Sequence, residues 1–567
     1  MKKYLFVTFG ILFVYMFIIA LQGFELTDEG FVLTFYQQIF HAPQTVEYNF
    51  LYYLSSLVGG VWNILFGFGG ILSFRVLAII VYLLIVYVTT LTVKKYLQPK
   101  LILIASLFVV ISFFGITVFH HNQLTALLVA VSVYFILKGL NAEKSYWPVF
   151  WGALFVGINI FTRIPNVTMI GLGLLLFVDY YYEKNKFRLW KNILYSFGGL
   201  VSGVLLVLII MFLCGHLEIF RQSIANNLFS LAGENTSTHS LANQIKSNIA
   251  GYWVVYGYLS VFVFTTGLCL FTYNVLKNKW FRIISVIFYS AVLFVFFIVF
   301  NLNNEKYYAL ILFPLLISTV VDRHNKPVML LNIASLLIMF LLPFGSGLGI
   351  IDMGKSCIWL GTFVSVIHVS RFVEYQIKNK ANYTYRIFAR LFFVLYAISC
   401  LAAVSHTAYF DYGNRLEKRY RANNSKFTVF TDKEKADAMD ELLSALNKYV
   451  EKDDYLLAFE SLPMVHYLTE TRPYMGVSWV WSYPPESFKK QLDKAVATTP
   501  LPVVLRQKSQ PIGGFWTVPD TADKNVKSYS YFYDPKRIEY FEGFLRDNNY
   551  RMVWENDLFA IYILSNK

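Results

Sequence analysis

Stretches of about 20 apolar residues recur through the first 408 positions of the chain, separated by short polar segments. An α-helix of that length crosses the hydrocarbon core of a bilayer. The predicted fold class is therefore a polytopic α-helical membrane protein, with a transmembrane domain over 1–408. We expect about thirteen transmembrane helices, over residues 4–22, 71–92, 101–119, 124–140, 147–162, 167–182, 190–213, 252–275, 282–300, 307–321, 328–344, 356–373 and 387–408.

The composition agrees with this pattern. Of the 567 residues, 56% are hydrophobic and only 15% are charged, and the mean hydropathy is +0.50. A soluble protein carries about 25% charged residues. These values exclude a secreted soluble enzyme and a nucleic-acid-binding protein, so we expect membrane lipids, and no nucleic acid, among the partners.

The net charge of +14 indicates orientation. Residues 1–408 hold 27 basic and 13 acidic residues, whereas residues 409–567 hold 22 of each. With a cytoplasmic N-terminus, 21 of those 27 basic residues fall in cytoplasmic loops and six on the opposite side. Because cytoplasmic loops are enriched in Lys and Arg, we expect the N-terminus in the cytoplasm and the C-terminal segment outside it.

Residues 23–70 form the first outward loop in this topology. The uncharged stretch 50–74 is long enough to be a second span, which would reverse every later loop and place Lys94 and Lys95 outside. The charge distribution argues against that interpretation. We therefore expect residues 31–70 to form helices in the outer membrane interface, a depth that suits their many aromatic side chains.

The segment 409–567 has the composition of a soluble protein. Its hydrophobic periodicity predicts alternating helices and strands, and hence a small extracytoplasmic α/β domain. The helices are expected over 433–450, 486–499 and 536–549, the strands over 455–460 and 502–507, and a closing strand pair over 552–564. The segment has no phosphate-binding loop or metal-ligand motif, so we expect it to act as a lid or an acceptor-docking domain.

The candidate chemistry lies at the outer ends of the helices. Almost no ionisable residue falls in the middle of a predicted span, which argues against an ion-coupled transporter. The most specific feature is TDEG at 27–30, directly after the first helix. Asp28 and Glu29 can be ordinary surface charges, but the interfacial sequence that follows would enclose them. A partly desolvated carboxylate can act as a general base.

This layout resembles the GT-C superfamily of membrane glycosyltransferases, and most of all the branch of protein O-mannosyltransferases and the aminoarabinose transferase of lipid A. The resemblance covers the order of parts along the whole chain, and its sequence-specific part is mainly the acidic pair. It implies that Asp28 is the catalytic base, or positions the acceptor nucleophile, with Glu29 as an accessory acid. It also implies a polyprenyl-phosphate sugar as donor.

A second resemblance involves NNEKYYALILFPLL at 303–316, which is similar to the family's basic and aromatic segment at the start of a late helix. Here Lys306 stands in place of the more usual arginine and is followed by Tyr307 and Tyr308. This match implies that the three residues bind the donor phosphate. A lysine that snorkels to the interface beside anchoring tyrosines would give the same pattern.

Three further outward residues are candidates. Arg163, in FTRIPN at 161–166, can bind the phosphate or pair with an acid. His120 and His121, at the outer turn between the third and fourth helices, can bind the substrate or a metal, although no third ligand has clear spacing. The GT-C superfamily has members that use a divalent metal and members that do not, so a metal is possible and the sequence does not decide.

These features together predict an integral membrane hexosyl- or pentosyltransferase of the outer face of a bacterial inner membrane. It would move a sugar from polyprenyl phosphate to a lipid, glycan or protein acceptor, with inversion at the anomeric carbon. The alternatives are a lipid-linked-glycan flippase and a non-enzymatic envelope-assembly protein. A flippase requires charged residues inside the spans, and an assembly protein gives no reason to enclose an acidic pair.

Overall fold

The structure, a computed structural model, describes residues 2–112, 117–142, 146–228, 241–299, 304–344, 349–378, 394, 396–508 and 534–565. The predicted helices over 101–119, 282–300 and 387–408 lie partly outside these ranges.

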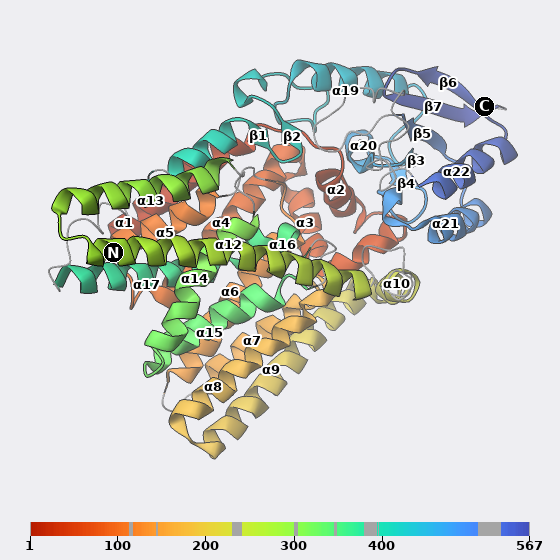
Figure 1. The fold of residues 1–567 in the computed structure, drawn as a ribbon. Helices are drawn as coiled ribbons and strands as arrows, with labels where there is room; N and C mark the ends of the chain where they lie inside the picture. The colour runs from red at the N-terminus through yellow and green to blue at the C-terminus, as the bar shows by residue number, and fades with distance from the viewer. Residues whose placement is uncertain are drawn as a thin grey trace.

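Helices make up the described chain up to Ser405, as Figure 1 shows. They are α1 (Lys2–Ala20), α2 (Asp28–Gln38), α3 (Tyr53–Phe66), α4 (Gly70–Val93), α5 (Pro99–Ile111), α6 (His121–Leu140), α7 (Trp147–Asn159), α8 (Leu174–Glu183), α9 (Lys186–Leu213), α10 (Leu217–Ser223), α12 (Leu241–Val275), α13 (Lys279–Val299), α14 (Asn304–Val321), α15 (Lys326–Leu341), α16 (Ile350–Cys357), α17 (Trp359–Lys378) and a helix over Tyr396–Ser405. The 3₁₀ segments η1 (Pro43–Tyr52), η2 (Gly67–Gly69) and η3 (Ile164–Gly173) and the π-helical segment η4 (Ile224–Leu228) complete this part.

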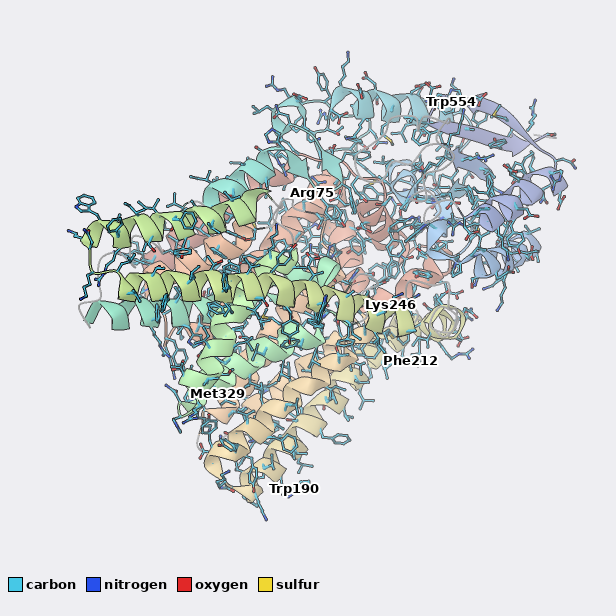
Figure 2. The ribbon with its side chains drawn as sticks, viewed as in Figure 1. Arg75, Trp190, Phe212, Lys246, Met329 and Trp554 are labelled. Atoms are coloured by element: carbon cyan, nitrogen blue, oxygen red, sulfur yellow. The ribbon has the colours of Figure 1, made fainter. Side chains whose placement is uncertain are left out.

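Six of the helical segments in the described part of the chain are long and apolar enough to cross a membrane, and further apolar helices are shorter. Several carry large apolar side chains on their outer faces. Along α9, Phe197, Leu205 and Phe212 are exposed, and Figure 2 shows Phe212 on the outer side of this helix. Because exposed apolar surface on this scale is stable in lipid and not in water, the protein is an integral membrane protein.

Small residues lie in the most extensive helix contact of the described membrane part, that between α7 and α9. A Cβ atom on Gly199 would lie 2.1 Å from the carbonyl oxygen of Phe150, and one on Gly203 would lie 2.2 Å from that of Leu154. Glycines four residues apart therefore let the two backbones touch, the usual way in which helices pack without a hydrophobic driving force.

The region predicted as interfacial helices forms α2, η1 and α3. Only α3 has an exposed apolar face, which includes Ile64, Leu65 and Phe66. By contrast, α2 is enclosed by protein, because most of its residues, polar Thr34 and Gln38 included, are buried.

The rest of the chain, residues 407–565, is called here the C-terminal segment. It contains a hairpin of β1 (Thr407–Ala408) and β2 (Asp411–Tyr412) and a five-stranded mixed sheet in the order β4-β3-β5-β7-β6. Strand β3 is parallel to both β4 and β5, and β7 is antiparallel to β5 and β6. The elements are η5 (Arg415–Glu417), α19 (Lys433–Leu446), β3 (Tyr455–Phe459), α20 (Pro463–Thr469), β4 (Arg472–Pro473), η6 (Val480–Ser482), α21 (Pro485–Thr498), β5 (Val503–Gln507), α22 (Pro535–Asp547), β6 (Tyr550–Glu555) and β7 (Phe559–Leu564).

Helix α20 attaches this segment to α2, where the acidic pair lies. The backbone N–H of Met464 donates to the carbonyl of Leu26 at 3.0 Å, and the hydroxyl of Thr34 donates to the carbonyl of Pro463 at 3.0 Å. A Cβ on Gly30 would lie 2.1 Å from the Met464 nitrogen. The glycine of TDEG is therefore needed for the close approach of α20.

Candidate functional site

The candidate site begins where α1 ends and α2 starts. The side chain of Glu25 turns forward and caps α2, accepting hydrogen bonds from the backbone N–H groups of Thr27, Asp28 and Glu29 at 2.8, 2.5 and 2.8 Å, and from the Thr27 hydroxyl. These N–H groups belong to the start of the helix and have no partners within it. A carboxylate at a helix N-terminus is also favoured by the helix dipole. Glu25 therefore fixes the backbone on which Asp28 and Glu29 stand.

Glu29 is held in a buried ion pair with Arg75 of α4. Nε and one terminal nitrogen of Arg75 donate to the two carboxylate oxygens of Glu29 at 3.1 and 2.8 Å, and both residues are 1% exposed. The backbone N–H of Val118 donates to Glu29 as well, at 2.9 Å. Both oxygens are thus occupied, which does not favour the predicted role of accessory acid.

Arg75 also holds the loop that leads to the acids. Its guanidinium donates to the carbonyl oxygens of Ala20, Gln22 and Gly23 at 2.9, 3.2 and 2.8 Å. Figure 2 shows Arg75 where the helices of the membrane part meet the C-terminal segment. The bidentate pair with Glu29 therefore fixes both ends of the turn that presents Asp28.

Asp28 is the acid with access to solvent, being partly exposed where Glu25 and Glu29 are buried. Its Oδ2 accepts a hydrogen bond from the hydroxyl of Tyr409, which lies in the turn between β1 and β2. Among the three acids, Asp28 is therefore the one that can meet a substrate.

The charge states of the buried acids follow from their surroundings. Burial, with the nearby carboxylates of Asp28 and Glu29, raises the pKa of Glu25 to about 8. Burial would also raise the pKa of Asp411, but the ammonium groups of Lys435 and Lys418 hold this pKa below its ordinary value. The pKa values of these two buried acids are therefore shifted in opposite directions, and Asp411 is ionised beside its two lysines.

The turn that carries His120 and His121 lies beside α2, because Val118, two residues before His120, donates its backbone N–H to Glu29. His120 is the N-cap of α6: its Nδ1 accepts from the N–H of Asn122 at 3.1 Å. The ring of His121 stacks on Tyr52 at 4.5 Å between ring centres. His121 Nδ1 and Asn122 Oδ1 are buried and have no hydrogen-bond partner within the described ranges. Such atoms commonly bind water or a ligand.

Arg163 lies near His121 and is 4% exposed. Its guanidinium donates to the carbonyl oxygens of Leu342 and Phe344 at 2.9 and 3.2 Å and to the side chain of Asn166 at 3.3 Å. These carbonyls follow the end of α15, where backbone acceptors lack partners. Arg163 therefore stabilises the end of α15, whatever else it binds.

Lys306 is fully buried in the first turn of α14, with its ammonium 5.5 Å from the ring centre of Tyr258 on α12. Tyr307 and Tyr308 have a different environment. The hydroxyl of Tyr307 contacts that of Thr362 at 3.2 Å, and the hydroxyl of Tyr308 donates to the carbonyl of Met339. Both tyrosines therefore use their hydroxyls within the helix packing, which does not favour their predicted contact with phosphate.

The acidic and histidine side chains around Asp28 do not form a site for a metal ion. Glu29 is neutralised by Arg75, Glu25 accepts backbone N–H groups, and Nδ1 of His120 accepts from the backbone as well. The described residues contain no group of three His, Cys, Asp or Glu side chains that could hold an ion. Asp28 and Nδ1 of His121 remain, and two ligands do not make a metal site among the described residues.

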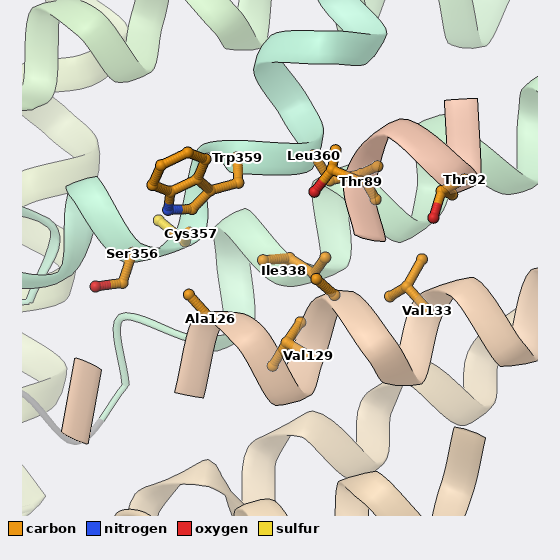
Figure 3. Close-up of a pocket in the computed structure, with 11 residues that line it drawn as sticks. Thr89, Thr92, Ala126, Val129, Val133, Ile338, Ser356, Cys357, Trp359 and Leu360 are labelled. Atoms are coloured by element: carbon orange, nitrogen blue, oxygen red, sulfur yellow. The ribbon is translucent and has the colours of Figure 1, made fainter. Parts of the chain in front are cut away.

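A small cavity lies elsewhere, between α4, α6, α15, α16 and α17. Figure 3 shows its lining, which includes Thr89, Val129, Cys357 and Trp359. Its volume of about 20 Å³ has room for one water molecule and not for a sugar. We therefore assign the site to the residues around Asp28.

Sequence reasoning missed Glu25, Arg75, Tyr409 and Asp411. Arg75 carried a signal, because a lone charge in an apolar helix is usually paired or functional. Tyr409 and Asp411 carried none, because their partners in this site lie 381 and 387 positions away.

The fold is similar to those of solved membrane transferases. The oligosaccharyltransferase of Archaeoglobus fulgidus, crystallised with Zn and sulfate, is matched over 99% of this chain and 72% of its own, with 11% identity and a TM-score of 0.50. ArnT from Cupriavidus metallidurans, bound to undecaprenyl phosphate, is matched over 98% of this chain and 97% of its own, with 12% identity and a TM-score of 0.41. No protein-family model and no curated protein matches the sequence. The chain therefore shares its overall fold with the Archaeoglobus fulgidus oligosaccharyltransferase, a likeness that agrees with the resemblance noted in its sequence.

Proposed function

We propose that this protein transfers a sugar from a polyprenyl-phosphate donor to a hydroxyl-bearing acceptor of the cell envelope, outside the cytoplasm of a bacterium. The observation that carries the proposal is the position of Asp28. It starts a buried helix, is partly exposed, and is flanked by Glu25, which caps that helix, and by Glu29, which is paired with Arg75.

Asp28 acts as the general base in this proposal. The acceptor oxygen forms a bond to the anomeric carbon as the bond from that carbon to the phosphate oxygen breaks. The acceptor proton passes to Asp28, and the phosphate leaves with the electron pair. Direct displacement inverts the anomeric configuration.

Lys306 and Arg163 are the proposed phosphate-binding groups. Lys306 lies at the start of α14 beside the ring of Tyr258, and its ammonium can act on a phosphate as a point charge. Arg163 lies near His121, whose Nδ1, like Oδ1 of Asn122, has no hydrogen-bond partner among the described residues and is suited to bind a sugar hydroxyl.

The C-terminal segment is proposed to be an extracytoplasmic α/β domain that completes the site. Two observations support this role: Tyr409 reaches Asp28, and α20 packs on α2.

Purified protein in detergent, given radiolabelled polyprenyl-phosphate sugars and envelope extracts, tests the proposal. We expect labelled acceptor and free polyprenyl phosphate in equal amounts. A protein that only moves the lipid across a bilayer would release no free polyprenyl phosphate, and that result would favour a flippase.

A further inference from the structure

Tyr409 makes a contact across the interface between the membrane part and the C-terminal segment. Its phenol donates a hydrogen bond to Oδ2 of Asp28. It stands in the two-residue turn between β1 and β2, next to Phe410, which has a φ of +48°. Such a tight turn limits where the Tyr409 side chain can point.

The hairpin that carries Tyr409 is fixed to the loop before Asp28. Asp411 is fully buried, and its Oδ2 accepts from the backbone N–H of Phe24 at 2.9 Å. Its Oδ1 accepts from the ammonium groups of Lys418 and Lys435 at 2.7 and 2.5 Å.

A close backbone contact supports this attachment. A Cβ on Gly23, whose φ is +101°, would lie 2.7 Å from the Cβ of Ala408. The hairpin thus cannot move without moving the turn that presents Asp28.

We propose that Tyr409 is a positioning residue, which orients the Asp28 carboxylate so that it can take the acceptor proton. The terminal torsion of an aspartate is broad, so a free carboxylate samples many orientations. A hydrogen bond to one oxygen fixes the plane of the group and directs the other oxygen. A phenol stays protonated at neutral pH and serves as a constant donor.

This inference rests on the proposed function, because it acts through Asp28. It assigns the C-terminal segment a direct part in the reaction: the segment supplies the group that orients the base. A cover over the site would need no such contact.

The test is a double-mutant cycle on sugar transfer with Tyr409→Phe and Asp28→Asn. Hydrogen bonds to charged groups are stronger than those between neutral groups, so Tyr409→Phe should lower kcat roughly 10-fold or more. The KM for the acceptor should stay unchanged. In the Asp28→Asn background the same substitution should have no further effect, because there is no base left to orient.

Tyr420→Phe is the matched control, since it removes the same hydroxyl from an exposed tyrosine of the same segment. It should behave like the wild-type protein. The melting temperature of each variant separates an effect on folding from one on turnover.

Two outcomes would overturn the inference and leave the proposed function intact. In the first, Tyr409→Phe is at least as active as the wild type while Asp28→Asn is inactive. In the second, Tyr409→Phe lowers kcat equally in the wild-type and the Asp28→Asn backgrounds. A wild-type protein that transfers no sugar, or an Asp28→Asn protein with full activity, would instead overturn the proposed function and the inference with it.

Discussion

The neighbouring acids Asp28 and Glu29 have separate surroundings, from which we infer separate roles. Asp28 faces partly outward, whereas Glu29 is closed off by Arg75 and Val118. Adjacent side chains on a helix diverge by about 100°, which explains how one dipeptide serves two purposes.

Glu29→Gln should therefore act on folding more than on chemistry. The change leaves Arg75 buried without its counter-charge, which typically costs about 3–5 kcal/mol. We expect a clear drop in the melting temperature in detergent, and a partial recovery in the double variant Glu29→Gln/Arg75→Met. A Glu29→Gln protein of wild-type stability with a large loss of kcat would show that Glu29 takes part in the reaction.

The role of Lys306 can also be tested by single substitutions. If its ammonium binds the donor phosphate, Lys306→Ala should raise the KM for the donor roughly 10-fold or more, as expected for a lost contact between charged groups. Lys306→Arg should retain much of the activity. Lys246→Ala, at an exposed lysine labelled in Figure 2, is the control. If both Lys306 variants bind donor like the wild type, Lys306 is an interfacial anchor and Arg163 is the better candidate.

At the scale of elements, α2 is held by contacts from α4, from the hairpin and from α20. Helix α20 includes His466, which is 1% exposed and whose pKa burial lowers to about 3. The ordinary histidine pKa is about 6.5. Between these two values the unfolded chain binds a proton that the folded protein does not.

The stability of α20 should thus fall as the pH drops from about 6.5 towards 3, by up to about 1.4 kcal/mol per pH unit. Above pH 6.5 this contribution is fully present. His466→Asn keeps a polar atom near Thr471, the hydrogen-bond partner of His466 at 3.2 Å, and does not titrate. Melting curves between pH 7 and 4 should show a smaller acid loss for the variant. Parallel losses would contradict a buried neutral histidine.

The hydrophobic periodicity of the sequence predicted helices and strands such as α19 and β3, but it did not predict which elements are in contact. The helix expected over 433–450 is α19, and the strand expected over 455–460 is β3. The short β4 and the β1–β2 hairpin were not expected, because two-residue strands have no periodicity to detect. For the same reason the sequence singled out Asp28 but not Tyr409.

The sequence also did not predict that α2 is enclosed by protein. Its apolar and polar residues suit an interfacial helix, and burial of Thr34 and Gln38 depends on acceptors offered by α20 and the residues after it. Only the folded chain brings these partners together.

At the scale of the whole molecule, the distribution of Lys and Arg sets the expected orientation. An engineered thiol at Ala497, an exposed position of α21, should react with a membrane-impermeant reagent in intact cells. A thiol at Lys186, at the start of α9, should react only after lysis. Both belong in a background without native cysteines, since Cys214 is exposed. The reverse pattern would invert the topology and place Asp28 in the cytoplasm.

The whole account depends on Asp28 as the base, and one measurement tests it most directly: the kcat of Asp28→Asn for sugar transfer from polyprenyl phosphate. Asparagine keeps the shape of the side chain and can still accept from Tyr409, but it takes no proton. General-base catalysis contributes about 10²–10⁴-fold, so kcat should fall by at least 100-fold with an unchanged melting temperature. Glu218→Gln, which removes an exposed outward charge, should keep full activity. A stable Asp28→Asn protein with near-wild-type turnover would contradict the account.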